Sequence, residues 1–96
     1  AYASRALDHE LDAAALSPRD ARLATEIVYG TLRVLPALDE ALDALLSRGR
    51  PDAFTFQALR CAAYQLRCLA RVPSHAVVQD TVAIVKQKRG ERLGKL

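Results

Sequence analysis

Long apolar runs, aromatic residues and helix-breaking residues are all scarce in this chain of 96 residues. No apolar run approaches the roughly 20 residues that a membrane-spanning helix needs, and no signal-peptide pattern opens the chain. Glycine and proline occur four times each, and aromatic residues make up 5% of the chain. Alanine and leucine dominate instead, so the composition favours helix over strand. We expect one cytoplasmic domain, of a size that is only marginally able to bury a core.

Only two cysteines are present, and their spacing argues against a disulfide. Cys61 and Cys68 lie seven residues apart in a predicted helix, which separates them by about 10.5 Å along its axis. A disulfide needs Cα atoms within roughly 7 Å of each other. No second pair of cysteines or histidines stands at metal-ligand spacing, which argues against a metal site. Both cysteines are therefore expected to be small, half-buried apolar residues in a reducing compartment.

The chain also lacks the motifs of common catalytic sites. It has no glycine-rich phosphate loop, no nucleophile elbow and no Ser/His/Asp set at a suggestive spacing. Neither cysteine has an activating setting, because a position in the middle of a helix lacks the helix N-terminus that lowers a thiol pKa. His75 lies in the first turn of a predicted helix, where a hydrogen bond to a buried carbonyl or a helix cap is expected rather than catalysis or metal binding. We expect no catalytic residue in this chain.

Apolar periodicity and capping residues predict five helices and no strand. The expected helices run from Ala1 to about Ala15, from Pro18 to about Val34, from Leu35 to Gly49, from Asp52 to the residues before Pro73, and from Ser74 to Gly90. The expected N-caps are Ser17, Asp52 and Ser74, and Gly49 is the expected C-cap. Because the connections are only a few residues long, the pattern predicts an all-α bundle.

Each predicted helix has an apolar face that is expected to be buried. The expected core residues are Leu7, Leu11, Leu23, Ala24, Ile27, Val28, Leu32, Leu35, Leu38, Leu42, Leu45, Leu46, Leu59, Ala62, Ala63, Leu66, Leu69, Val78, Val82 and Val85. Asp39, Glu40 and Asp43 are expected on the water side of the third helix, although Asp39 and Gln65 also suit hydrogen bonds between helices. Gly30, in the middle of a helix, costs up to about 1 kcal/mol relative to alanine. The close approach of another helix explains this glycine better than contact with nucleic acid.

Positive charge is concentrated at the C-terminal end of the chain. The net charge is +3, yet residues 1–85 hold nine Lys or Arg and ten Asp or Glu. Residues 86–96 hold five basic residues against one acidic residue. Such an end suits phosphate contacts, but it also suits a solvated helix end whose cations complement the helix dipole. The five basic residues are Lys86, Lys88, Arg89, Arg92 and Lys95.

A second basic feature lies on the predicted fourth helix. At 100° per residue, one narrow stripe opposite the leucine–alanine face contains Gln57, Arg60, Tyr64, Arg67 and Arg71. These arginines have no acidic partner along their own helix. Arginine binds phosphate through paired N–H groups, and a tyrosine between arginines can stack on an unpaired base. The alternative is a solvated face in which Tyr64 packs sideways against a neighbouring helix, and we favour this alternative for Tyr64.

Three blocks of sequence identify a family. They are SPRDARLATEIVYGTLR (17–33), ALRCAAYQL (58–66) and VPSHAVVQDTVAIVK (72–86). In this order and spacing they resemble the NusB-like domain that precedes the catalytic domain of bacterial 16S rRNA cytosine-5 methyltransferases, the Sun or Fmu family. The most specific pieces are Val28-Tyr29-Gly30, Leu32-Arg33, Tyr64-Gln65-Leu66, Val72-Pro73 and His75-Ala76-Val77. The resemblance departs at Gln79-Asp80, where the family usually has Asn-Glu.

The resemblance implies a NusB-like helical bundle, in which residues 1–96 form a single partial domain without the family's first and last helices. It implies that the domain binds RNA, with 16S rRNA as the expected partner. A separate C-terminal methyltransferase domain would then hold S-adenosylmethionine, and this chain would hold no cofactor. One alternative is a free-standing NusB-type antitermination factor that binds leader RNA and a small ribosomal protein. Another is a helical module that binds only proteins.

The RNA contacts that this resemblance implies fall on the basic residues. Arg33, on the outward side of the second predicted helix, is a further candidate, although it could instead pair with Glu26. The candidate RNA-binding residues are Arg33, Arg60, Arg67, Arg71, Lys86, Lys88 and Arg89. Because the absent first helix would cover apolar faces, we also expect the isolated chain to expose apolar surface or to self-associate.

Overall fold

The structure, a computed structural model, describes the backbone of residues 2–93 and the side chains of residues 5–93. Within this range the chain forms five helices and no strand. The helices are α1 (Tyr2–Ala14), α2 (Pro18–Arg33), α3 (Leu35–Leu45), α4 (Ala53–Cys68) and α5 (Ser74–Arg92). The predicted all-α fold is therefore confirmed. No helix in the described part of the chain is both long and apolar enough to span a membrane.

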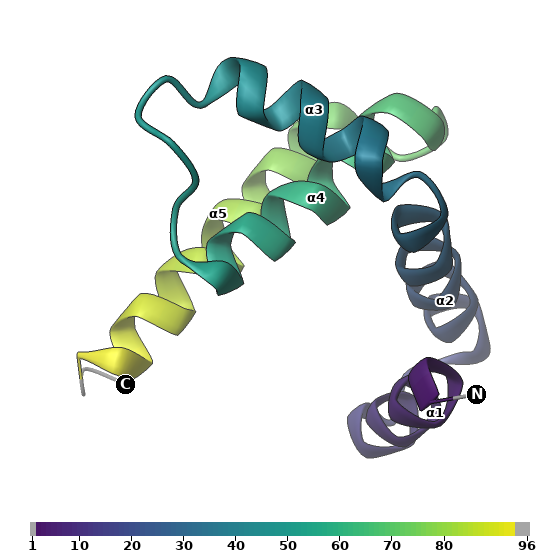
Figure 1. Cartoon of the computed structure of the whole chain (residues 1–96). Coiled ribbons are helices and arrows are strands. Elements are labelled where there is room, and N and C mark those ends of the chain that lie inside the picture. Colours follow the sequence, from purple (N-terminus) through teal and green to yellow (C-terminus); the bar gives the residue numbers. More distant parts are fainter. Residues whose placement is uncertain (1, 94–96) are drawn as a thin grey trace.

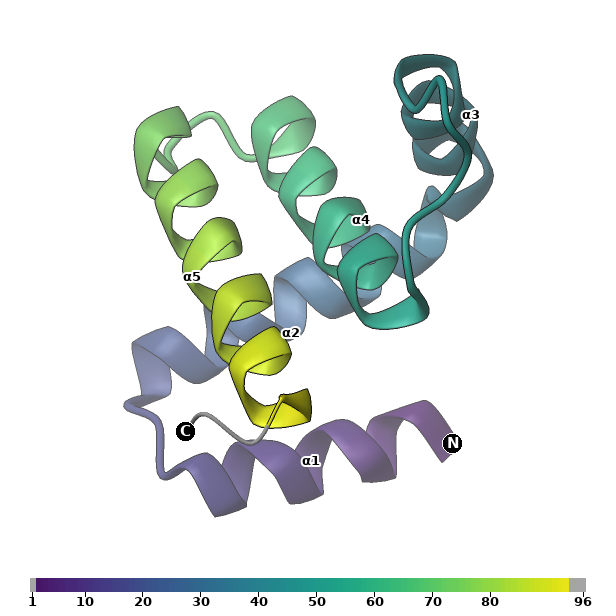
Figure 2. The same ribbon diagram turned by 90° about the vertical axis from the view of Figure 1, so that its left-hand side faces the viewer.

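Helix α4 lies at the centre of the molecule. It packs against α5, which runs alongside it in the opposite direction, and also against α2 and α3 (Figures 1 and 2). Helix α1 lies below α2 and runs in roughly the opposite direction (Figure 2), and it makes no extensive contact with any other helix in the described residues. Leu7 and Leu11, the apolar stripe of α1, are accordingly only half-buried. The core is therefore built around α4.

Two of the three predicted N-caps are present. The Ser17 hydroxyl accepts a hydrogen bond from the Asp20 N–H at 3.2 Å, and Pro18 occupies the first helical position of α2. The Asp52 carboxylate accepts hydrogen bonds from the N–H and the hydroxyl of Thr55, at 3.1 and 2.8 Å. The prediction for α5 is wrong, because Ser74 is already helical and the capping position belongs to Pro73, with no side-chain hydrogen bond.

Helix α3 ends earlier than predicted. Its last helical residue is Leu45, and the N–H of Leu46 donates to the carbonyl of Leu42 at 3.0 Å. Gly49 is therefore not the C-cap. It lies in the following turn with a φ of +87°, and its N–H donates to the carbonyl of Leu46 at 3.0 Å. Glycine suits this position because it adopts the left-handed region without a steric penalty.

The fully buried core is small. Its apolar members are Leu38, Phe56, Ala62, Tyr64, Leu69 and Val77. Leu38, Tyr64 and Leu69 form one cluster, against which Leu23, Ile27, Val34, Ala63 and Val72 pack. Tyr64 retains only 5% of its surface exposure. The expectation that this ring packs sideways against neighbouring helices is confirmed, and the ring is not available to stack on a base.

Several residues predicted to be buried are exposed instead. They are Leu32, Leu45, Leu66, Val78 and Val82. Helix α5 shows the reason: it packs on α4 through Val77, which is 2% exposed, while the next residue, Val78, is 53% exposed. Neighbouring residues on a helix point about 100° apart, so only one of two adjacent valines can face α4. The predicted exposure of apolar surface is confirmed, and it includes Ile84 at 49%.

Gly30 marks the place where α2 crosses α4. It is buried together with Thr31. A Cβ atom placed on Gly30 would overlap the Tyr64 ring. The glycine is therefore explained by the close approach of two helices, as the sequence predicts, and its helix-propensity cost is offset by this packing.

Substitution of Gly30 by Ala is expected to destabilise the fold by about 1–3 kcal/mol, because the added methyl group overpacks the contact with Tyr64. The free energy of unfolding from urea titrations measures this effect. In a Tyr64→Leu background the same substitution should cost much less, since the ring is gone. An equal cost in both backgrounds would show that the Gly30–Tyr64 contact does not set the helix spacing.

The exposed valines of α5 are expected to drive self-association of the isolated chain. Val78 and Val82 lie one turn apart on the same face and are 53% and 46% exposed. Sedimentation should therefore show concentration-dependent dimers or larger species, and the double substitution Val78→Lys and Val82→Lys should shift them toward monomer. A wild-type chain that sediments as a monomer and unfolds in one cooperative step at all concentrations would contradict this.

Candidate nucleic-acid interface

Arg60 is held within the fold by Asp39. Its Nε and Nη2 groups donate to the two carboxylate oxygens of Asp39 at 2.7 and 2.6 Å, which joins α4 to α3. Both side chains are largely shielded, with 14% and 19% exposure. The prediction that Asp39 faces water is wrong, whereas its predicted hydrogen bond between helices is confirmed. The Arg60 guanidinium is thus already engaged in a bidentate pair.

A second arginine completes this cluster around Phe56. The guanidinium groups of Arg50 and Arg60 lie 4.4 and 4.7 Å from the centre of the buried ring, which suits cation–π attraction. Arg50 also donates two hydrogen bonds to Asp43, at 2.9 and 2.8 Å. The hydrogen bond from Arg60 is the main reason that the pKa of Asp39 lies below its ordinary value. The cluster therefore fixes the turn between α3 and α4 onto the core.

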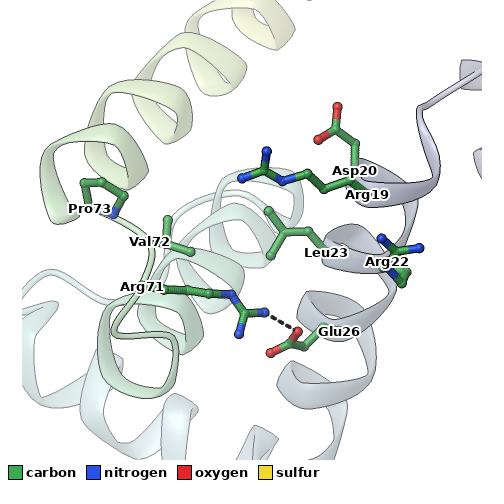
Figure 3. A pocket seen from close by; sticks show the side chains of 8 residues that line it. All are labelled: Arg19, Asp20, Arg22, Leu23, Glu26, Arg71, Val72 and Pro73. Atoms are coloured by element: carbon green, nitrogen blue, oxygen red, sulfur yellow. Dashed lines mark hydrogen bonds and ion pairs between the residues drawn. The ribbon is translucent and has the colours of Figure 1, made fainter.

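Arg71 forms a different kind of pair. Its Nη2 group donates to the Glu26 carboxylate at 2.7 Å and links the turn after α4 to α2 (Figure 3). The arginine side chain nevertheless stays 68% exposed. The sequence leaves an ion pair between Arg33 and Glu26 as the alternative to RNA contact by Arg33. Since Arg71 occupies Glu26 and no such pair forms with Arg33, that alternative is wrong.

The remaining basic residues are mostly exposed and available. Arg33, Arg67, Lys86 and Arg89 are exposed, and none has a side-chain hydrogen bond or ion pair within the described residues. Lys88 lies 5.4 Å from the centre of the Phe54 ring. Arg92 donates to Asp52 at 3.3 Å, and Lys95 lies outside the described residues. The C-terminal end of α5 is thus both solvated and able to meet phosphates.

The predicted residues do not form one continuous site. Helices α4 and α5 run in opposite directions, so Arg67 lies near the opposite end of the pair from Lys86 and Arg89 (Figure 2). Within the predicted stripe, the buried Tyr64 separates Arg60 from Arg67. The predicted stripe is therefore not one exposed face, because neighbouring helices cover α4 on more than one side.

A cavity of about 460 Å³ lies between the N-terminal half of α2 and the turn that joins α4 to α5 (Figure 3). Its lining consists of Arg19, Asp20, Arg22, Leu23, Glu26, Arg71, Val72 and Pro73. Arg19 and Arg22 are not among the RNA-binding residues that the sequence predicts. The cavity was missed because it needs a turn about 50 residues further along the chain, and helical periodicity carries no signal of that contact.

Two smaller cavities of about 380 and 270 Å³ share Gln57 and Cys61 in their linings. Burial raises the pKa of the Cys61 thiol above its ordinary value. Cys68 is exposed rather than half-buried, and both cysteines are free. The Thr31 hydroxyl, in the smaller cavity, is buried without a hydrogen-bond partner in the described residues. By contrast, the hydroxyls of Thr25 and Thr81 donate to carbonyls one turn earlier, at 2.8 and 2.7 Å.

Two further polar residues differ from their predicted roles. His75 is exposed and neither caps a helix nor donates to a buried carbonyl within the described residues. The Gln65 amide donates to the carbonyl of Cys61 at 3.2 Å, inside its own helix rather than between helices. In the described part of the chain, no group of three or more His, Cys, Asp or Glu residues is placed to hold a metal ion.

The sequence as a whole matches the model of the NusB family over residues 1–96. The chain belongs to the NusB family. Relatives of this NusB chain include the ribosomal RNA small subunit methyltransferase B of Vibrio cholerae, 40% identical over 81% of the chain and 18% of the relative. Proteins named probable ribosomal RNA small subunit methyltransferase B also match. That of Synechocystis is 34% identical over 99% of the chain and 22% of the relative, and that of Bacillus subtilis is 32% identical over 90% and 20%.

These relatives confirm the resemblance that the three sequence blocks indicate. The NusB chain spans about a fifth of the length of the curated relatives it matches. No solved structure gives a significant match to it.

The substitution Asp39→Asn is expected to lower the melting temperature at pH 7. It should also make the melting temperature less sensitive to a fall in pH. Arg60 holds the pKa of Asp39 below 3.8 in the folded chain. The pair therefore stabilises the fold above that pH, and this stabilisation is lost as the pH falls through the lower, folded value. Thermal melts between pH 7 and pH 2 measure both effects.

Asp43→Asn is the matched control. It removes a carboxylate from the same helix, but the Asp43–Arg50 pair is about half exposed, at 46% and 47%. Exposed pairs contribute little to stability, so this variant should melt close to the wild type at pH 7. Equal melting temperatures for the two variants would contradict a special role for the shielded pair.

Proposed function

We propose that this chain is the RNA-binding N-terminal part of an S-adenosylmethionine-dependent 16S rRNA cytosine-5 methyltransferase. The observation that carries the proposal is the match, over most of the chain, to proteins named ribosomal RNA small subunit methyltransferase B. A part that makes up about a fifth of such proteins is long enough for a docking domain. Its role would be to hold structured rRNA while a separate domain reaches an unstacked cytosine. An rRNA substrate in turn implies a cytoplasmic location.

The chemistry is assigned to residues outside this chain. None of the three cavity linings contains a glycine, which would let the backbone approach a nucleoside closely, and this supports an S-adenosylmethionine site outside this chain. Neither cysteine lies at a helix N-terminus, the setting that activates a thiol: Cys61 lies inside α4, where burial raises its pKa, and Cys68 ends this helix. We therefore assign no catalytic residue and no methyl-donor site to this chain.

Exposed cations support the RNA-binding role. Arg33, Arg67, Lys86 and Arg89 keep their charged groups in solvent, with no acidic partner in the described residues. Contacts to phosphate supply most of the sequence-independent affinity for nucleic acid. Arg60 is the weakest of the predicted contacts, because its Nε and Nη2 groups already donate to Asp39. RNA binding by this domain is therefore assigned mainly to residues at the ends of α2, α4 and α5.

The double substitution Lys86→Ala and Arg89→Ala is expected to weaken the binding of transcribed 16S rRNA about tenfold at 50 mM salt. If both residues meet phosphates, the slope of log K against log salt should fall by roughly 1.4–1.8, according to whether the contacted RNA is single-stranded or paired. Filter binding across a salt series measures both quantities.

A matched double variant, Arg5→Ala with Arg48→Ala, loses the same charge from exposed positions outside this region. It should bind nearly as well as the wild type. If both variants weaken binding alike, only net charge matters. If the wild type itself binds no RNA at low salt, the proposal fails, and the alternative of a purely protein-binding module is favoured.

A further inference from the structure

We propose that the cavity between α2 and the turn after α4 binds one unpaired nucleotide of an RNA strand. In this site Arg19, Arg22 and Arg71 hold the phosphate, and the base lies against Leu23, Val72 and Pro73 (Figure 3). The inference rests on the proposed RNA-binding function and names the site and the form of RNA that it takes. The cavity, about 460 Å³, falls within the usual range of ligand pockets.

The arginines approach the cavity from two separate segments. Figure 3 shows the guanidinium of Arg19, from α2, and that of Arg71, from the turn, on opposite sides of Leu23. Arg22 completes the cationic lining from the next turn of α2. Cations that converge from two segments can surround an anion, whereas cations along one helix face cannot. Phosphate is the anion that arginine pairs with most effectively in nucleic acids.

The donors in this cavity are largely unused. Arg71 has one hydrogen bond, from Nη2 to Glu26 at 2.7 Å, out of the five N–H donors of a guanidinium. Within the described residues, the side chains of Arg19 and Arg22 have no hydrogen bond or ion pair. Glu26 thus orients Arg71 across the cavity while using only one of its N–H donors. The remaining N–H groups can bind a phosphate.

The acidic residues of the lining do not cancel this charge. Glu26 is neutralised by its ion pair with Arg71. The Asp20 carboxylate points away from Leu23 and Arg71 (Figure 3), and Asp20 contributes its N–H to the Ser17 cap. The cavity also lies beside the first turns of α2, a 16-residue helix whose positive end favours an anion. The lining as a whole holds three arginines and two acids, so its net charge is +1.

The apolar part of the lining is held in place by the core. Leu23 and Val72 are half-buried and pack against the cluster of Leu38, Tyr64 and Leu69. A rigid apolar surface beside cations suits a base and its phosphate together. Only an unpaired base can turn its face onto such a surface, so the site should prefer single strands to duplexes. The polar groups of the lining are the arginines that hold the phosphate and the two acids, so the base meets mainly apolar side chains and little sequence preference is expected.

The test is the affinity of the 96-residue chain for a fluorescein-labelled, mixed-sequence 12-nucleotide RNA. The double substitution Arg19→Ala and Arg22→Ala should weaken binding of the single strand at least fivefold, and it should weaken binding of the matched duplex much less. Neither arginine has a side-chain partner in the part of the chain that the structure describes, so the fold should be retained, which circular dichroism checks. The control is again Arg5→Ala with Arg48→Ala, which should bind the single strand like the wild type.

A strand with abasic sites throughout separates a nucleotide site from a simple phosphate site. It keeps every phosphate, and it should bind more weakly than the normal strand to the wild type but not to the Arg19/Arg22 variant. If the abasic strand binds the wild type equally well, the base does not occupy the cavity and the inference is overturned. If the variant matches the control while the wild type still binds RNA, this site is wrong and the proposed function stands. If the wild type binds neither the normal single strand nor the duplex, both this site and the proposed function are overturned.

Discussion

The contact between the Tyr64 ring and the backbone of Gly30 determines how closely α2 approaches α4, and the positions of the other elements follow from that crossing. Once α2 lies against α4, Thr31 is buried beside it and Leu23 reaches the turn after α4. Tyr64 then occupies the core with Leu38, so α3 must fold back over the same helix. A fold with so few fully buried residues depends strongly on a single tight contact.

Ion pairs decide which arginines of this NusB chain stay available. Two acids placed on other helices, Asp39 and Glu26, reach Arg60 and Arg71 across the structure. The first pair is shielded and bidentate, and it fastens α3 to α4. The second is exposed and single, and it orients an arginine at the edge of a cavity. Arg60 and Arg71, which the sequence predicts in one helical stripe, thus serve different purposes because they meet acids at different depths.

Most of the fold was predictable from local sequence signals. The Ser17 and Asp52 caps and the helix order depend on residues close together in the chain, and Gly30 in the middle of a helix indicates a close helix contact without identifying Tyr64 as its partner. Apart from the caps predicted at Ser74 and Gly49, the errors concern contacts between distant residues. Val77 rather than Val78 faces α4, and Asp39 reaches an arginine 21 residues away. The cavity at Arg19 needs the turn at Val72. Helical periodicity identifies apolar stripes, but adjacent apolar residues leave the packed face ambiguous, and periodicity does not identify the neighbour.

The position of α1, apart from the helices that pack on α4, gives the molecule two levels of local stability. A helix of 13 residues is marginal in water without tertiary contacts, and α1 makes no extensive ones in the described residues. Its amide hydrogens should therefore exchange with solvent through local fraying, whereas those of α4 should exchange only when the whole core opens. A binding partner could therefore order or unfold α1 at a lower cost in free energy than any other helix. If a partner covered Leu7 and Leu11, the folding of α1 would be coupled to binding.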